Sequence, residues 1–363
     1  MPIHRAVQWL SVYGRRYPQA WDLFAKLQKD RPEPWPEWCW CPLAGAHGVI
    51  ARHHEIWQTE PLPDTAALGA IAAWRATQGI YRFDRTLLDE LLESDIPGNV
   101  PVNALERMPA WCVYIETPDL TFAKFQVHGF YAHLEWDFDR KQMELRFAID
   151  ATNAEEPDFE SLVTCMVDLG GTFEEGFASA RRRSQEHSLS WYRQGVEQEA
   201  KRENKTLTPE EVEARATYLW EVEGAHLEFL LKQLTSLLLY LCADEADVPR
   251  PEKLPVRWVY TKKKHLILPS AQGQTIYPCG TVIGAKLRQA RKDFDEHIRY
   301  LNSTGRKQRP HWRQGHYKPY WIGKRTEPQT QIVHWIPAGP VGFKSRDMTV
   351  PEVATIRPVK DGE

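Results

Sequence analysis

The sequence predicts an α+β protein: an antiparallel sheet or meander with long packed helices and a basic C-terminal region that contains further β structure. Residues 111–169 alternate in the manner of strands, two capping sequences open long helical stretches, and the charge balance changes near residue 250. With 363 residues and 42% hydrophobic content, the chain can bury a substantial core.

The first 60 residues are predicted to form an N-terminal helix and a Pro- and Trp-rich arm. A helical pattern covers residues 16–29, and the stretch 31–42 that follows contains four prolines and three tryptophans. Prolines at this density exclude a regular helix. We therefore expect an ordered loop or an extended arm between residues 31 and 42.

Residues 61–249 are predicted to form a central α+β core with long helices. One helix is expected over residues 64–77, with Asp64 or Thr65 as its cap, and another over residues 84–93. The second carries leucines on a single stripe, which indicates a face packed on the core.

Strands are expected after these helices. Residues 111–115 are rich in strand formers, and residues 141–149 alternate apolar with charged side chains. Residues 125–136 lie between them, residues 137–140 read as a turn, and residues 161–169 form a fourth candidate strand. Together these segments predict an antiparallel meander.

Two capping boxes open the long helices of the central region. In each, a threonine precedes a glutamate by three positions: Thr172 with Glu175, and Thr208 with Glu211. The second box has a proline at the first helical position, where its missing N–H costs nothing. This helix becomes apolar at residues 237–241, so we expect its C-terminal part to be buried.

Residues 250–363 are predicted to form a basic recognition region. Between residues 250 and 325 there are eighteen Lys and Arg residues against four Asp and Glu, although the whole chain has a net charge of −3. Within this stretch, residues 309–325 combine cations, imidazoles and large aromatic faces. The candidate binding residues are Arg309, His311, Trp312, Arg313, His316, Tyr320 and Trp321.

Three interpretations of this segment remain open from the residues alone. Cations interleaved with aromatic rings suit single-stranded nucleic acid or ribosomal RNA. The same residue types dominate peptide and protein interfaces, so an acidic or extended peptide fits equally. In the third interpretation the aromatic rings pack on the core and leave the cations as ordinary surface.

The sequence lacks strong signatures of catalysis, metal binding and membrane insertion. It contains no phosphate-binding loop, no HExxH helix and no GxSxG elbow. Cys39 and Cys41 are not spaced as zinc-binding pairs are, and Asp137 and Asp139 fall in a predicted turn rather than a magnesium site. We expect no enzyme activity, no metal and no cofactor, and a cytoplasmic protein without a membrane partner. The alternative is an RNA-binding protein or a ribonuclease in which His311 and His316 act as acid and base.

Several distinctive motifs occur in order along the chain: Trp74-Arg75, residues 79–84 (GIYRFD), residues 109–115 (PAWCVYI), residues 309–316 (RPHWRQGH), Tyr320-Trp321 with Gly323, and residues 335–338 (WIPA). Together these motifs resemble the second type V-A anti-CRISPR family. The resemblance covers roughly residues 72–115 and 277–341, while the N-terminal arm and the charged helices between residues 173 and 215 are similar to the family only loosely.

The resemblance implies a protein of a phage or plasmid that protects the element inside a bacterial host cell from the type V-A CRISPR effector nuclease. It implies that the protein recognises the nascent effector polypeptide and lowers effector expression, through loss of the effector mRNA during translation. The partners implied are the effector polypeptide and, beyond it, the ribosome or the mRNA. A basic face that tolerates ribosomal RNA beside a peptide-binding groove is compatible with this role.

Overall fold

The structure is a computed structural model, and it separates into two compact units that each combine distant parts of the sequence. Unit 1 comprises residues 1–81, 108–234 and 250–277, and unit 2 comprises residues 82–107, 235–249 and 278–363. The three-part division along the sequence stays a prediction. The residues described are 3–54, 64–122, 124–157, 162–202, 205–251, 253–304, 311–323 and 330–341.

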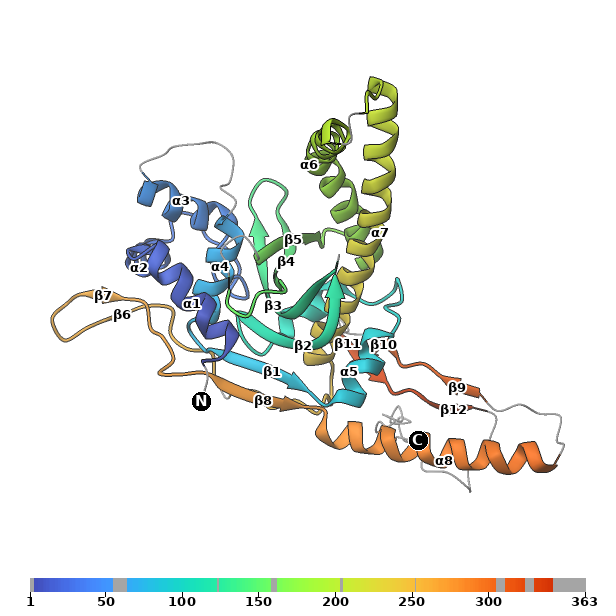
Figure 1. The fold of residues 1–363 in the computed structure, drawn as a ribbon. Helices are drawn as coiled ribbons and strands as arrows, with labels where there is room; N and C mark the ends of the chain where they lie inside the picture. Colours follow the sequence, from blue (N-terminus) through green and yellow to red (C-terminus); the bar gives the residue numbers. More distant parts are fainter. Residues whose placement is uncertain are drawn as a thin grey trace. The chain divides into compact units, whose positions relative to one another are not determined.

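Unit 1 opens with four helices (Figure 1): α1 (Arg5–Arg16), α2 (Ala20–Asp30), α3 (Leu43–His54) and α4 (Thr65–Trp74). The predicted helix over residues 16–29 corresponds to α2, but α1 was not predicted. The N-cap of α1 is His4, which is not one of the usual capping residues. Its Nδ1 atom accepts a hydrogen bond from the backbone N–H of Ala6 at 3.1 Å. The segment 31–42 is irregular, as expected.

The predicted capping role of Asp64 is wrong, although α4 begins where expected. The carboxylate of Asp64 makes no hydrogen bond to the first turn of α4. It instead accepts a hydrogen bond from the hydroxyl of Tyr17 and pairs with Arg16 at 3.2 Å. A long-range ion pair has therefore displaced the local interaction that the sequence suggested.

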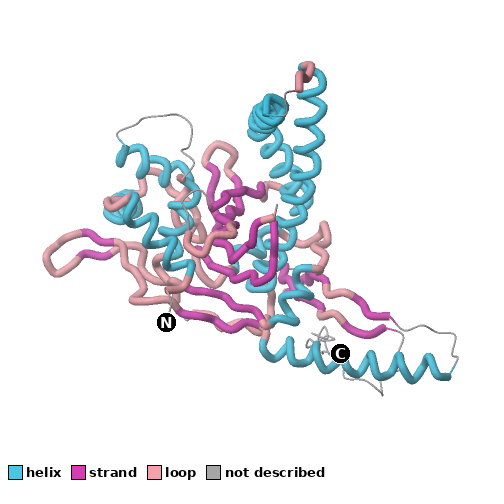
Figure 2. Tube along the Cα trace, viewed as in Figure 1, coloured by secondary structure: helices cyan, strands magenta, loops and turns pink. Residues whose placement is uncertain are grey.

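A six-stranded sheet follows in the order β5-β4-β3-β2-β1-β8. Its strands are among the magenta segments of Figure 2. The predicted antiparallel meander is confirmed over β2 to β5, and α4 packs across β2, β3 and β4. The short strand β1 was not predicted; it pairs parallel with β2. The strands are β1 (Gly79–Phe83), β2 (Cys112–Phe122), β3 (Phe125–Asp137), β4 (Gln142–Ala151), β5 (Leu162–Asp168) and β8 (Thr275–Cys279).

Both capping boxes form as predicted, at the starts of α6 (Phe173–Arg202) and α7 (Pro209–Cys242). The N–H of Thr172 donates to Glu175 at 2.8 Å, and the N–H of Thr208 donates to Glu211 at 2.8 Å. The apolar residues 237–241 at the end of α7 are buried. Among the described residues, none of the helices combines the length and the apolar character that crossing a lipid bilayer requires.

The remaining elements complete the α+β fold. In unit 1 a small hairpin, β6 (Val259–Tyr260) with β7 (Leu266–Ile267), carries the lysine turn 262–264. Unit 2 contains α5 (Arg85–Leu92), the 3₁₀-helix η1 (Val102–Arg107), α8 (Thr281–Thr304), β9 (His311–Arg313), β10 (His316–Ile322), β11 (Thr330–Ile336) and β12 (Gly339–Val341).

The last four strands form one two-stranded ribbon. His316 pairs with Ile336 and Arg313 pairs with Gly339, so both strands advance by three residues and the register continues across the interruption. Gly315 lies at that interruption, where a Cβ atom would stand 2.6 Å from the ring of Trp335. Glycine is therefore required there for the indole to cross the ribbon.

The helices α5 and α8 are joined through Asp84. Its Oδ1 accepts the N–H of Thr86 at 3.0 Å, which caps α5, and both carboxylate oxygens accept from Arg288 of α8 at 2.7 and 2.8 Å. Gly284 allows this approach, because a Cβ there would stand 2.1 Å from Oδ1 of Asp84. A second pair, Arg291 with the buried Glu90, joins the same two helices.

We predict that Asp84→Ala lowers the free energy of unfolding by about 2 kcal/mol, because it removes both the cap and the partner of Arg288. Urea denaturation measures the change. The matched control is Asp89→Ala, since Asp89 forms an exposed pair with Arg85 on the same helix at 3.2 Å. That variant should shift stability by no more than about 0.5 kcal/mol. Equal losses in the two variants would contradict the role assigned to Asp84.

Candidate functional site

The candidate binding residues predicted from the sequence are distributed along the ribbon of unit 2. Strand β9 carries His311, Trp312 and Arg313. Strand β10 carries His316, Tyr320 and Trp321. Arg309 lies outside the described residues. The ribbon thus brings the predicted segment onto one element, but its members have different surroundings.

The half-buried Trp312 packs on helix α8. Its ring meets the ring of Phe294 edge to face, with 5.5 Å between centroids, and the guanidinium of Arg291 lies 5.4 Å from its centroid. The neighbouring Arg313 is exposed and reaches only the carbonyl of Pro337, at 3.5 Å. Trp312 therefore contributes at least partly to folding.

The middle of the ribbon is part of the core of unit 2. Tyr317 is buried, and its hydroxyl donates to the backbone oxygen of Ser236 in α7. The indole N–H of Trp335 donates to the hydroxyl of Ser94 at 2.9 Å. His316 lies beside Tyr317 and pairs with Asp95 in an isolated bridge. These contacts fix the ribbon to the helices of its own unit.

The described end of the ribbon is exposed. Trp321 is 63% exposed and Ile322 is 40% exposed, although both are large apolar side chains. Beside them, the ammonium of Lys318 lies 5.1 Å from the ring centroid of Tyr320, which meets the imidazole of His334 edge to face. We call residues 318–322 the ribbon tip. An exposed indole beside a lysine is a suitable surface for a protein or nucleic-acid partner.

The structure does not bring the two predicted catalytic imidazoles into contact. His311 is exposed on β9 and His316 is half-buried on β10, and within the described residues no hydrogen bond or ring contact joins them. Acid–base catalysis needs both groups at one reacting centre. The contacts seen therefore give no support to a ribonuclease centre at this pair.

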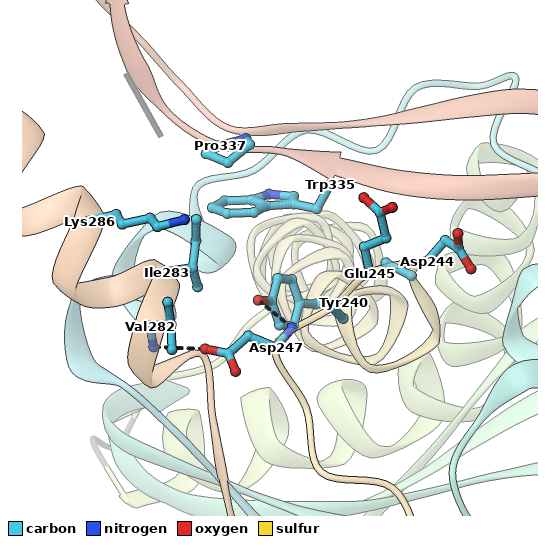
Figure 3. A pocket seen from close by; sticks show the side chains of 11 residues that line it. Tyr240, Asp244, Glu245, Asp247, Val282, Ile283, Lys286, Trp335 and Pro337 are labelled. Carbon is cyan, nitrogen blue, oxygen red and sulfur yellow. Dashed lines mark hydrogen bonds between the residues drawn. The ribbon is translucent and has the colours of Figure 1, made fainter. Parts of the chain in front are cut away.

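Unit 2 also contains a cavity of about 350 Å³ that was not predicted (Figure 3). Its lining comes from the end of α7 and the turn after it, the start of α8, and β11. The rings of Tyr240 and Trp335 meet edge to face with 5.6 Å between centroids. The lining residues are Tyr240, Ala243, Asp244, Glu245, Ala246, Asp247, Val282, Ile283, Lys286, Trp335 and Pro337. We call this cavity the Trp335 pocket.

Two of the three carboxylates of the Trp335 pocket accept hydrogen bonds from other residues of unit 2. Asp244 accepts from the guanidinium of Arg107 at 2.7 Å. Asp247 accepts the N–H of Val282 at 2.7 Å, at the positive end of the α8 dipole. Within the described residues, no ion pair or hydrogen bond engages the side chain of Glu245 or that of Lys286.

The hydroxyl of Tyr240 stays protonated in this pocket. Burial raises its pKa, and the neutral oxygen accepts the N–H of Asp247 at 3.4 Å. The sequence offered two signals for the pocket: the acidic run at residues 244–247 directly after an apolar helix end, and the WIPA motif at residues 335–338. Neither signal indicates that the two segments meet, because tertiary packing brings them together.

A second polar cluster lies inside the sheet of unit 1. Arg146 stands between two carboxylates, 2.7 Å from Glu135 and 2.6 Å from Glu144, and the imidazole of His133 lies 3.3 Å from Glu135. A cavity of about 490 Å³ adjoins the cluster and is lined in part by Arg146 and Glu144. The charges here are compensated mainly by one another, so the Trp335 pocket is the better candidate for a ligand.

Burial sets the protonation of this cluster. It lowers the pKa of His133 to about 3, and the nearby charge of Arg146 acts in the same direction. Burial also raises the pKa of Glu135 to about 7, although Arg146 favours the ionised form. Between about pH 4.5 and 6.5, the unfolded chain carries a proton on the histidine, and the native chain carries it on the glutamate. The pair therefore contributes almost no pH dependence to stability in this window.

We predict that single substitutions expose two opposite pH dependences. In Glu135→Gln, His133 is the one group of the pair that still titrates. It is neutral in the native chain and protonated in the unfolded chain over this window. The free energy of unfolding therefore rises by up to roughly 2 kcal/mol as the pH increases from about 4.5 to 6.5. In His133→Gln the free energy of unfolding falls as the pH increases over the same window, because Glu135 is protonated in the native chain and ionised in the unfolded chain. Urea denaturation across this window, compared with the unsubstituted protein, measures both slopes. Unchanged slopes in both variants would contradict the assignment.

The cysteines and carboxylates provide no metal centre among the described residues. No group of three or more His, Cys, Asp or Glu side chains there is placed to hold an ion. All six cysteines are described and none forms a disulfide; Cys39 and Cys41 are buried, and burial raises the pKa of both thiols. Thiols of this kind behave as small apolar side chains.

Comparison with known proteins identifies the family. No curated protein matches the chain. A solved structure described as the crystal structure of AcrVA2 shares the fold: its TM-score is 0.56 at 20% identity, and the alignment covers 93% of this chain and 99% of that chain. The anti-CRISPR type V subtype A2 family matches residues 81–343, which is well over half of the 363 residues. The chain belongs to this anti-CRISPR family.

Proposed function

We propose that this protein recognises the polypeptide of a type V-A CRISPR effector nuclease as it is synthesised and lowers effector expression by causing loss of its mRNA during translation. The observation that carries the proposal is the family match over residues 81–343. In this proposal the protein acts by binding, without catalysis of its own, inside the bacterial host cell. The ribosome and the mRNA are further partners.

The surfaces of unit 2 support a binding role. The ribbon tip presents the exposed ring of Trp321 beside Lys318, and aromatic and cationic side chains of this kind often anchor protein interfaces. The Trp335 pocket offers a cavity large enough for one side chain of a partner. The excess of cations between residues 250 and 325, a stretch that contributes to both units, suits work beside ribosomal RNA.

A recoding experiment separates recognition of the polypeptide from recognition of the mRNA. One effector gene is recoded synonymously, so that the nucleotides change and the polypeptide does not. A second carries two compensating frameshifts, so that nearly all nucleotides stay and a stretch of polypeptide changes. Effector mRNA is measured by quantitative reverse transcription and effector protein by immunoblot, in cells with and without this protein.

The proposal expects the synonymous gene to remain sensitive and at least one frameshifted gene to become resistant. The opposite pattern would identify an RNA-binding protein, and normal mRNA and protein for every gene would overturn the proposal. A catalytically inactive effector serves as a control, since loss of its mRNA cannot depend on effector activity.

We predict that Trp321→Ala weakens the effect on effector mRNA by at least about threefold, which corresponds to the loss of a modest interface contact. Because the indole is 63% exposed, stability should change by less than about 0.5 kcal/mol. Tyr218→Ala is the matched control: this ring on α7 is 64% exposed and belongs to unit 1. Equal activity in the two variants would remove Trp321 from the binding surface.

A further inference from the structure

We propose that the Trp335 pocket receives one arginine side chain of a polypeptide partner. The inference rests on the proposed function only in taking a polypeptide as the ligand. All residues that line the pocket belong to unit 2, so it is formed within one compact unit.

The lining matches the two parts of an arginine side chain. Val282, Ile283 and Pro337 provide apolar surface for the aliphatic stem. The rings of Trp335 and Tyr240, which are 5% and 3% exposed, form the inner wall of the cavity, where the small part of each ring that reaches it can contact a planar guanidinium. A cavity of about 350 Å³ accommodates such a side chain together with part of its main chain.

The charges of the lining call for a single cation. Asp244 is paired with Arg107, and Asp247 is engaged by the start of α8. Glu245 is exposed, and no hydrogen bond or ion pair within the described residues engages its carboxylate. In Figure 3, Glu245 and Lys286 lie on opposite sides of the Trp335 ring. A guanidinium entering on the Glu245 side leaves Lys286 to attract carbonyl oxygens of the partner backbone.

The backbone at Glu245 supports a role beyond local folding. Its φ is 59°, in the left-handed region that glycine and asparagine adopt most readily. A glutamate there costs conformational energy, and no contact of its side chain within the described residues offsets that cost. In this proposal an arginine of the partner pairs with the exposed carboxylate of Glu245.

The backbone also provides a sharp test, because Glu245→Asn removes the long carboxylate without straining the chain. This variant should be at least as stable as the unsubstituted protein, so a loss of binding is not a loss of folding. Lys264→Asn is the matched control, since Lys264 has the same φ of 59° in the β6–β7 hairpin of unit 1. Urea denaturation measures the stability of both variants.

The probes are four capped pentapeptides, acetyl-Gly-Leu-X-Leu-Gly-amide, with arginine, lysine, citrulline or norleucine at X. Citrulline has nearly the shape of arginine and no charge. Binding to the full chain is followed through the indole N–H resonance of Trp335, assigned with Trp335→Phe. The arginine peptide should bind at least about tenfold more tightly than the citrulline peptide, and more tightly than the lysine peptide.

In Glu245→Asn the preference for arginine over citrulline should disappear, and in Lys264→Asn it should persist. Equal affinities for arginine and citrulline, or an unchanged preference in Glu245→Asn, overturn the pocket assignment; tighter binding of lysine overturns the choice of arginine. The recoding experiment fails or succeeds separately. Selective arginine binding with normal effector mRNA would retain the pocket and remove the proposed function, while effector loss without arginine selectivity would do the reverse.

Discussion

A carboxylate placed at a helix N-terminus is the interaction on which unit 2 depends. Asp247 accepts the N–H of Val282 through its side chain and the N–H of Gly280 through its backbone oxygen, both at 2.7 Å. Asp84 then caps α5 and accepts Arg288 from the neighbouring α8. Unpaired N–H groups and the helix dipole both favour an anion at these positions. Because Asp247 also lines the Trp335 pocket, the same contact that starts α8 fixes one wall of the cavity.

Local patterns predicted the elements whose structure is decided locally. Both capping boxes need only residues three positions apart, and the meander needs only alternation and short turns, so these features were visible in the sequence. The role of Asp64 was missed because Tyr17, 47 positions away, competes for its carboxylate. Strand β1 was not predicted, since its parallel partner lies beyond α5 and η1 along the chain. The Trp335 pocket depends on three distant segments, which no local pattern connects.

The motifs that carry the family resemblance are mostly structural. The indole N–H of Trp74 donates to the carbonyl of Gly79 at 2.8 Å, and that of Trp111 donates to the carbonyl of Glu37 at 3.1 Å. Trp335 similarly reaches Ser94. Each large ring fills the core and satisfies its one donor, which makes such residues hard to exchange. A signature of this kind identifies the fold and its family. Other motif residues, such as His311, Arg313 and Trp321, are exposed.

The segments that line the Trp335 pocket lie far apart in the sequence, and this affects when the pocket can form during synthesis. Its lining extends from Tyr240 to Pro337, so a chain emerging from the ribosome cannot close the cavity until Pro337 has been translated. The capping boxes of α6 and α7, by contrast, are complete as soon as each first turn emerges. The locally specified helix starts are therefore complete in the nascent chain before the lining of the cavity is. A product truncated before β11 would contain α6 and α7 and would lack Trp335 and Pro337 of the pocket.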